Sequence, residues 1–292
     1  MEVFVGYHYY VKFLKWLAIS VLAYVVTGII IHPDWLKVLH FTFMPKIEFS
    51  GAYVFAMMAV FGTTITPYLF FWQASEEVEE NMLHKKLHKL FGEKKENLHT
   101  RIGRMRTDVG TGMILANIVF FFIVVTSAHT FFANGITNIQ SAEQAALALR
   151  PLAGNYAYLL FAFGIIGTGL LAVPVLAGSG AYAIAELLKW HEGLELKVSQ
   201  AKGFYFVITI SILVGLALNF FHINPITALY YSAFLNGVIA IPLLVIIMIV
   251  GNDKKIMGRE THPAWVKFFG WLAIVFMALL SLISVWLYFS KS

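Results

Sequence analysis

The residues best suited to bind an ion lie in segment 62–68, where a glycine, three threonines and a proline interrupt an apolar run. Pro67 has no N–H, and its ring clashes with the carbonyl four residues back, so the carbonyl of Thr63 loses its helical partner. A freed carbonyl is tolerated at membrane depth only where it lines protein or a water-filled cavity. Such breaks hold ions in transporters. The alternative is a plain proline kink whose carbonyl is satisfied by the threonine hydroxyls.

Further polar residues lie inside or at the ends of apolar runs, where polar groups mostly face the interior of a helix bundle. Asn236 is followed by Gly237 and Pro242, and either an ion-binding role or a simple interhelical hydrogen bond would explain it. The other such residues are Asn117, Ser127, His129 and Asn219. No Asp, Glu, Lys or Arg lies in the core of any apolar run, so the sequence offers no paired in-span carboxylates for hydrolysis. We therefore expect a protein that is not an enzyme.

The only long polar stretch, 74–108, begins with four glutamates: Glu76, Glu77, Glu79 and Glu80. If the helix that carries Pro67 continues into this stretch, they form an acidic band. The band would attract cations to a cytoplasmic opening, or it would simply be the solvated face of a helix.

Two histidine patterns suggest metal binding but are weak. His84 and His88 have a chelating i, i+4 spacing, yet three neighbouring lysines would repel a cation. Segment 191–195 (HEGLE) is similar to half of a zinc-protease motif and lacks the second histidine.

Composition identifies the chain as a membrane protein. Its 292 residues are 59% hydrophobic and 13% charged, and the mean hydropathy is +0.75, values that are unusual for a soluble domain. The absence of cysteine excludes disulfides and thiolate metal sites.

Seven apolar runs have about the length that a membrane helix needs, roughly 20 residues. We predict an all-α integral membrane protein with seven transmembrane helices, in which residues 1–292 form a single polytopic domain. Residues 74–108 would be the cytoplasmic connection between the second and third spans. The runs are 14–31, 51–73, 109–132, 156–187, 203–221, 225–250 and 264–289.

The distribution of basic residues predicts the topology. Of the 21 Lys and Arg residues, 17 fall in the N-terminal flank, 74–108, 188–202 and 251–267. The positive-inside rule places these segments in the cytoplasm, with the N-terminus inside and the C-terminus outside. This topology accounts for the net charge of +5, so we expect the lipid bilayer as a partner and no nucleic acid.

Three segments resemble the Nramp family of divalent metal transporters. Segment 62–80 is similar to the family's sixth helix, with the pattern Gly-Ala-x-x-Met-Pro-His, and 108–117 and 235–242 are similar to its seventh and tenth helices. The resemblance implies the leucine-transporter-type fold of two inverted five-helix repeats. The seven runs would then correspond to helices five to eleven.

The resemblance also implies a function and a site. It predicts transport of a divalent cation of the Mn²⁺, Fe²⁺ or Mg²⁺ class across a bacterial plasma (inner) membrane, with no cofactor. Carried over by position, the metal site comprises the carbonyl of Thr63, the side chain of Thr66, and Asn236, at a break between Gly62 and Pro67. Thr66 replaces the family's methionine, and a hard hydroxyl suits Mg²⁺, Ca²⁺ or Mn²⁺ better than a thioether does.

Other family features are missing from this sequence. Tyr68 stands where the family has a histidine, and run 203–221 lacks the arginine usual in the ninth helix. The first-helix Asp-Pro-Gly motif is also absent, so the expected partners include N-terminal helices that carry an Asp-Pro motif. The alternative is a truncated, non-transporting membrane remnant or helper subunit that lacks the first-helix half of the ion site.

Overall fold

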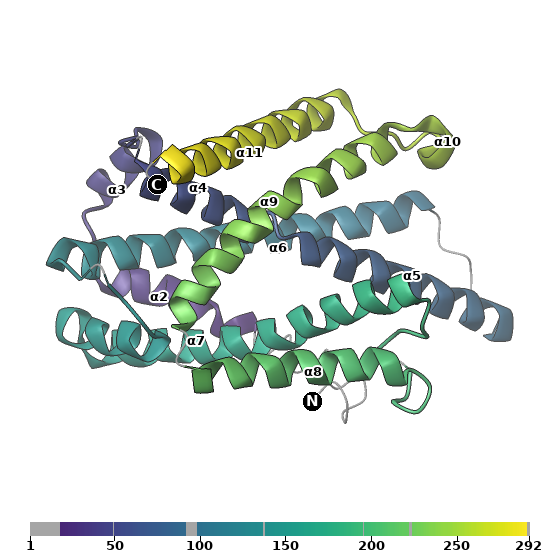
Figure 1. The fold of residues 1–292 in the computed structure, drawn as a ribbon, viewed down its shortest axis with the longest axis horizontal. Coiled ribbons are helices and arrows are strands. Elements are labelled where there is room, and N and C mark those ends of the chain that lie inside the picture. Colours follow the sequence, from purple (N-terminus) through teal and green to yellow (C-terminus); the bar gives the residue numbers. More distant parts are fainter. Residues whose placement is uncertain are drawn as a thin grey trace. The chain divides into compact units, whose positions relative to one another are not determined.

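The computed structural model describes residues 18–48, 50–91, 98–136, 138–194, 196–221 and 224–290, and these residues form helices and connections without a strand (Figure 1). They divide into two compact units, each described here by itself. The first unit comprises Met1–Pro45 and Phe71–His222, and the second comprises Lys46–Phe70 and Ile223–Ser292. The prediction of a single polytopic domain stays a prediction.

The second unit is a three-helix assembly. Helix α4 (Gly51–Thr64) packs against α9 (Pro225–Asn252) and α11 (Ala264–Ser290), which also pack against each other, and a short helix, α10 (Lys254–Met257), follows α9. Their shared core is centred on Met58, Ala240 and Met277, which are all fully buried.

Side chains in the preceding loops define where α4 and α9 begin. The Ser50 hydroxyl accepts a hydrogen bond from the Tyr53 amide, and the Asn224 side chain accepts bonds from the amides of Ile226 and Thr227. Each cap satisfies amide groups that lack partners in the first turn of a helix. Pro225, in the first turn of α9, has no amide hydrogen to satisfy.

The first unit contains α2 (Leu22–Ile30), α3 (Trp35–Phe43), α6 (Leu98–Thr130), α7 (Ala142–Leu188), α8 (Lys202–Leu218), the short 3₁₀ helices η1 (Phe132–Asn134) and η2 (Asn219–Phe221), and α5 (Pro67–Phe91) from Phe71 onward. Helix α2 packs against α6 and α7, and α7 packs along α8 (Figure 1). Two cores result: one surrounds Tyr24 and Phe161, and the other surrounds Tyr182 and Phe204. Within α7 the backbone departs from helical geometry at Gly154, with φ +84°.

Among the residues that the structure describes, five helical segments are long and apolar enough to cross a membrane: Gly51–Glu79, Ile102–Asn134, Gly154–Leu188, Pro225–Asn252 and Ala264–Leu287. A sixth exists if Ala18–Ile30 and Trp35–Phe43, which are bent by 113°, form one broken span. The remaining predicted run is helix α8, whose 17 residues extend about 26 Å at 1.5 Å per residue, less than the roughly 30 Å of a bilayer core. The count of seven is therefore not confirmed.

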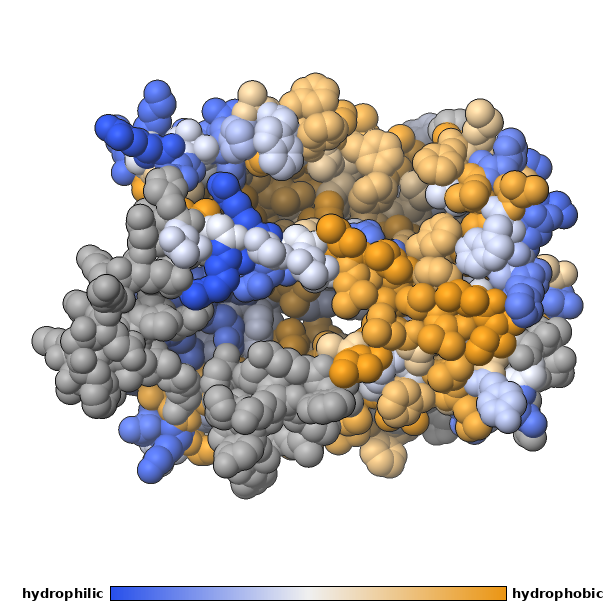
Figure 2. All heavy atoms as spheres, turned by 180° about the vertical axis from the view of Figure 1, so that it is seen from behind, coloured by the Kyte–Doolittle hydropathy of each residue, from blue (hydrophilic) through white to orange (hydrophobic). Residues whose placement is uncertain are grey.

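The surface agrees with a membrane environment. Many large apolar side chains are exposed along the helices, including Ile114 (65% exposed), Phe206 (63%) and Ile246 (57%). Figure 2 shows a broad stretch of hydrophobic residues on one face. Exposed apolar surface on this scale marks contact with lipid or protein.

The polar stretch 74–108 is largely helical. Helix α5 continues through it to Phe91, and α6 begins within it at Leu98. The prediction that the helix carrying Pro67 extends into this stretch is confirmed. Its location in the cytoplasm stays a prediction.

Candidate ion site at a helix break

The apolar run 51–73 is interrupted between α4 and α5, as the sequence predicts. Helix α4 ends at Thr64, Ile65 and Thr66 are not helical, and α5 begins at Pro67. The Ile65 amide donates to the Phe61 carbonyl at 2.8 Å and closes the last turn of α4. A continuing helix would next need the Thr66 amide to donate to the Gly62 carbonyl and the Pro67 amide to donate to the Thr63 carbonyl. Thr66 lies outside both helices, and Pro67 has no amide hydrogen.

The threonine hydroxyls at the break do not compensate for the missing proline donor. Those of Thr63 and Thr64 both donate to the carbonyl of Val60, at 2.9 and 2.8 Å. Both bonds point back into α4, away from the carbonyl of Thr63. The alternative of a kink satisfied by threonine hydroxyls therefore does not describe Thr63 and Thr64.

Thr66 differs from the other two threonines. It is buried, at 8% exposed, and its side chain forms a hydrogen bond with the Tyr68 hydroxyl. A threonine oxygen has two lone pairs and one proton. One hydrogen bond therefore leaves it able to accept a cation.

Gly62, two residues before the end of α4, lies against the backbone of α9. A Cβ added to Gly62 would collide with the carbonyl oxygen of Ala233 and would lie 2.5 Å from the Gly237 amide nitrogen. A Cβ added to Gly237 would lie 2.8 Å from the Met58 carbonyl oxygen. Only glycine at both positions permits this approach, and small residues serve this purpose at membrane helix crossings.

Asn236 precedes Gly237 in α9, so its Cα lies about 3.8 Å from that of the contact residue. Its side chain is half-buried and has no hydrogen-bond partner among the residues that the structure describes. The second unit thus contains all three predicted ligands: Thr63 in α4, Thr66 in the interruption between α4 and α5, and Asn236 in α9. The oxygens of these residues are hard donors, and hard donors suit cations such as Mg²⁺ and Mn²⁺.

The remaining polar residues predicted from the sequence have other roles or lie elsewhere. The Asn117 amide donates to the Met113 carbonyl one turn earlier in α6, at 2.8 Å, and Asn117 is exposed. His129 is also exposed, and Ser127 is half-buried. The side chain of Asn219 falls outside the described residues.

The acidic band lies on α5, where Glu76, Glu77 and Glu79 are half-buried. Glu79 accepts a hydrogen bond from Tyr182, so it is not on a purely solvated face. The side chains of Glu80, His84 and His88 lie outside the described residues, as does Glu195 of the HEGLE segment.

Glu192 of the HEGLE segment is half-buried, and its Oε2 has no hydrogen-bond partner among the described residues. Burial raises the pKa of this carboxyl, and the nearby charge of Glu186 raises it further. Within the described ranges, no three His, Asp or Glu side chains gather as a metal centre.

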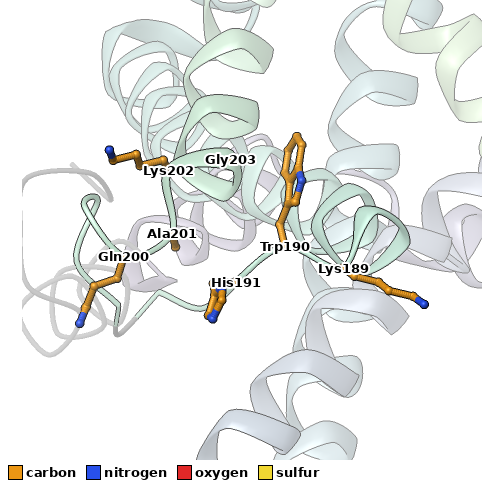
Figure 3. A pocket seen from close by; sticks show the side chains of 7 residues that line it. All are labelled: Lys189, Trp190, His191, Gln200, Ala201, Lys202 and Gly203. Carbon is orange, nitrogen blue, oxygen red and sulfur yellow. The ribbon is translucent and has the colours of Figure 1, made fainter.

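The described part of the first unit contains a groove and a smaller pocket. A groove of about 840 Å³ between α3 and α6 is mainly apolar, with Asp34, Lys37, Asn117 and His129 among its lining. A smaller pocket of about 400 Å³ lies where α7 connects to α8, and Lys189, Trp190, His191 and Lys202 are among its lining residues (Figure 3). The side chains of Lys189 and Lys202 extend in opposite directions, so they do not converge on one ligand.

No sequence pattern assigned a role to Tyr182, a buried polar side chain that bonds to two other segments. It is 1% exposed and bonds to both Glu79 and the Leu194 amide. A tyrosine near the end of a long apolar run was the available signal, because a buried hydroxyl needs a partner.

The long apolar helices define a polytopic α-helical membrane protein. The Nramp family model, described as natural resistance-associated macrophage protein-like, matches residues 2–287. The chain therefore belongs to the Nramp family.

Curated relatives agree. A divalent metal cation transporter MntH of Clostridium acetobutylicum is 25% identical over 92% of this chain and 57% of its own length. Proteins of the same name from Klebsiella pneumoniae and Caldanaerobacter subterraneus are each 27% identical, over 89% and 90% of this chain and 57% and 58% of their own lengths. The chain thus spans somewhat more than half the length of these relatives, whose names are those of transporters.

Proposed function

We propose that this protein transports divalent metal cations of the Mn²⁺, Fe²⁺ and Mg²⁺ class across a bacterial plasma membrane. One observation carries the proposal: the helix break falls at the close crossing of α4 and α9. That crossing brings a carbonyl released by Pro67 into the same unit as the half-buried Asn236. Membership of the Nramp family supports this choice over the alternative of a non-transporting remnant or helper subunit.

In this proposal the ion binds to three oxygens: the carbonyl of Thr63, the hydroxyl of Thr66 and the side-chain carbonyl of Asn236. Each is a hard ligand, and hard ligands suit Mg²⁺, Ca²⁺ and Mn²⁺. The N-terminus lies in the cytoplasm and the C-terminus outside, in line with the Lys and Arg distribution. The seven runs correspond to helices five to eleven of the inverted-repeat fold.

Substitution of Thr66 by methionine tests the site. A thioether in place of the hydroxyl is expected to weaken Mg²⁺ relative to Mn²⁺ by roughly tenfold, or about 1.4 kcal/mol. Electron paramagnetic resonance of Mn²⁺ bound to the purified chain, with Mg²⁺ as competitor, measures the ratio. Thr64→Met is the matched control, because the Thr64 hydroxyl bonds to Val60 within α4. An unchanged ratio in Thr66→Met at equal protein level contradicts the site.

A further inference from the structure

The end of the α5 span is fastened to α7 through one buried hydroxyl. Tyr182 on α7 is 1% exposed, and its hydroxyl donates to Glu79 Oε1 on α5 at 2.7 Å. The Tyr182 hydroxyl oxygen also accepts a hydrogen bond from the Leu194 amide, at 3.3 Å. Tyr182 therefore joins α5, α7 and the connection between α7 and α8 at one point.

The backbone of the connection between α7 and α8 lies close to the Glu79–Tyr182 hydrogen bond. Gly193 has φ +136°, a conformation that favours glycine, and a Cβ there would lie 2.9 Å from Glu79 Oε1. The Tyr205 hydroxyl on α8 donates to the carbonyls of Leu196, at 2.8 Å, and Leu194, at 3.3 Å. The backbone on both sides of residue 195 is thus held by two tyrosines from two helices.

Apolar contacts supplement the hydrogen bonds. The ring of Trp72, near the start of α5, meets the Tyr182 ring edge-on with centroids 5.8 Å apart. Trp72 also lies against Gly178, where a Cβ would collide with the indole. The Tyr182 ring lies 4.8 Å from that of Phe204 on α8.

The Glu79–Tyr182 hydrogen bond lies on the first-unit side of the point where α5 passes from one compact unit to the other. The compact units divide within α5, between Phe70 and Phe71. Residues on the α4 side of the division belong to the second unit, whereas Trp72 and Glu79 pack within the first. The two sides of the broken span are therefore attached to different units, and the Glu79–Tyr182 bond is a polar part of one attachment.

We propose that the Glu79–Tyr182–Leu194 hydrogen bonds form a latch, a conformational device that holds the part of α5 from Phe71 onward to α7 and α8. When these hydrogen bonds break, this part of α5 and the α7–α8 connection are released from Tyr182 together, because both are bonded to the same hydroxyl. The latch itself does not depend on the candidate ion site, but its role in moving an ion rests on the proposed function.

Hydrogen–deuterium exchange of the purified chain tests the latch. Tyr182→Phe keeps the ring and its packing but removes both hydrogen bonds, one of them to a carboxylate. We expect the exchange of backbone amides to rise about tenfold in peptides from the part of α5 after Phe71 and from 190–194. Glu79→Ala should have the same effect on α5, and the double variant should add little. Glu79→Gln, which keeps an acceptor oxygen, should stay close to the parent.

Two tyrosine variants serve as controls. Tyr205→Phe removes only the bonds to the Leu194 and Leu196 carbonyls, so it should loosen the connection and leave α5 protected. Tyr156→Phe alters an exposed residue of the same helix, α7, and should change neither. Unchanged α5 exchange in Tyr182→Phe overturns the latch, as do additive effects of Glu79→Ala and Tyr182→Phe.

Repeating the parent measurement with Mn²⁺ separates the latch from transport. A twofold or greater Mn²⁺-dependent change in α5 exchange, absent from Tyr182→Phe, supports a role in ion movement. No Mn²⁺ effect in a parent that binds Mn²⁺ overturns that role but not the latch. Failure to bind Mn²⁺ at all counts against the proposed function alone.

Discussion

Gly62 and Gly237 bring the backbones of α4 and α9 together at the helix break. A Cβ on Gly237 would lie 3.4 Å from the Gly62 Cα and 2.8 Å from the Met58 carbonyl oxygen. The two glycines belong to helices separated in sequence by the whole first unit from Phe71 onward. Their contact decides which residues of α9 lie near the break.

Gly62→Ala should destabilise the second unit by about 2 kcal/mol, because a methyl group has no room beside the α9 backbone. Thermal unfolding of the purified protein in detergent measures the effect. Gly215→Ala in α8 is the control, since a Cβ there meets nothing within 4 Å. The control should be neutral or slightly stabilised through helix propensity. Equal melting temperatures for Gly62→Ala and the parent would show that the crossing is looser than the structure indicates.

If Asn236 is a ligand as proposed, Asn236→Ala should weaken Mn²⁺ binding about tenfold, or roughly 1.4 kcal/mol, because it removes one of the three proposed oxygen ligands. Titration of the purified chain with Mn²⁺ gives the affinity. Asn117→Ala is the matched control: it also removes an asparagine from an apolar helix, but one that bonds only within α6. If both variants bind Mn²⁺ as the parent does, Asn236 is not a ligand.

Glu192→Gln should stabilise the protein at pH 7 by well under about 1 kcal/mol, because solvent screens much of the charge of this partly exposed carboxylate. Burial and the charge of Glu186 raise the pKa of Glu192 above 4.5 in the folded state. This carboxyl therefore favours folding most below pH 4.5, and that contribution is lost as pH rises through the raised pKa. The difference in melting temperature between Glu192→Gln and the parent should be largest at neutral pH and vanish below pH 4.5.

An exposed carboxylate provides the control for this experiment. Glu48→Gln changes a residue exposed in the loop before α4 and should show a smaller difference at neutral pH. A parent that matches Glu192→Gln at every pH would mean that solvent screens the Glu192 charge.

Membrane topology can be read by cysteine labelling, because the chain has no cysteine of its own. A cysteine at Lys255 should react only with reagents that reach the cytoplasm, and one at Asn138 should react from outside. Both residues are exposed. Reaction of the Lys255 position from outside alone would reverse the assigned orientation.

The sequence by itself determined the features that follow from covalent structure and local composition. Pro67 lacks an amide hydrogen wherever the chain folds, so the interruption between α4 and α5 could be predicted, and the release of the Thr63 carbonyl stays a prediction. Apolar runs predicted most of the long helices. The sequence also indicated that the helix carrying Pro67 can continue into the polar stretch, but not that it ends at Phe91.

Only the tertiary structure decided which distant residues meet. Gly62 could have faced lipid or any helix, and its contact with Gly237 depends on how α4 and α9 pack. The hydrogen bond between Glu79 and Tyr182 could not be predicted either, because no sequence pattern around either residue indicates which residue it contacts. Contacts between residues far apart in the chain depend on complementary packing, which local periodicity does not encode.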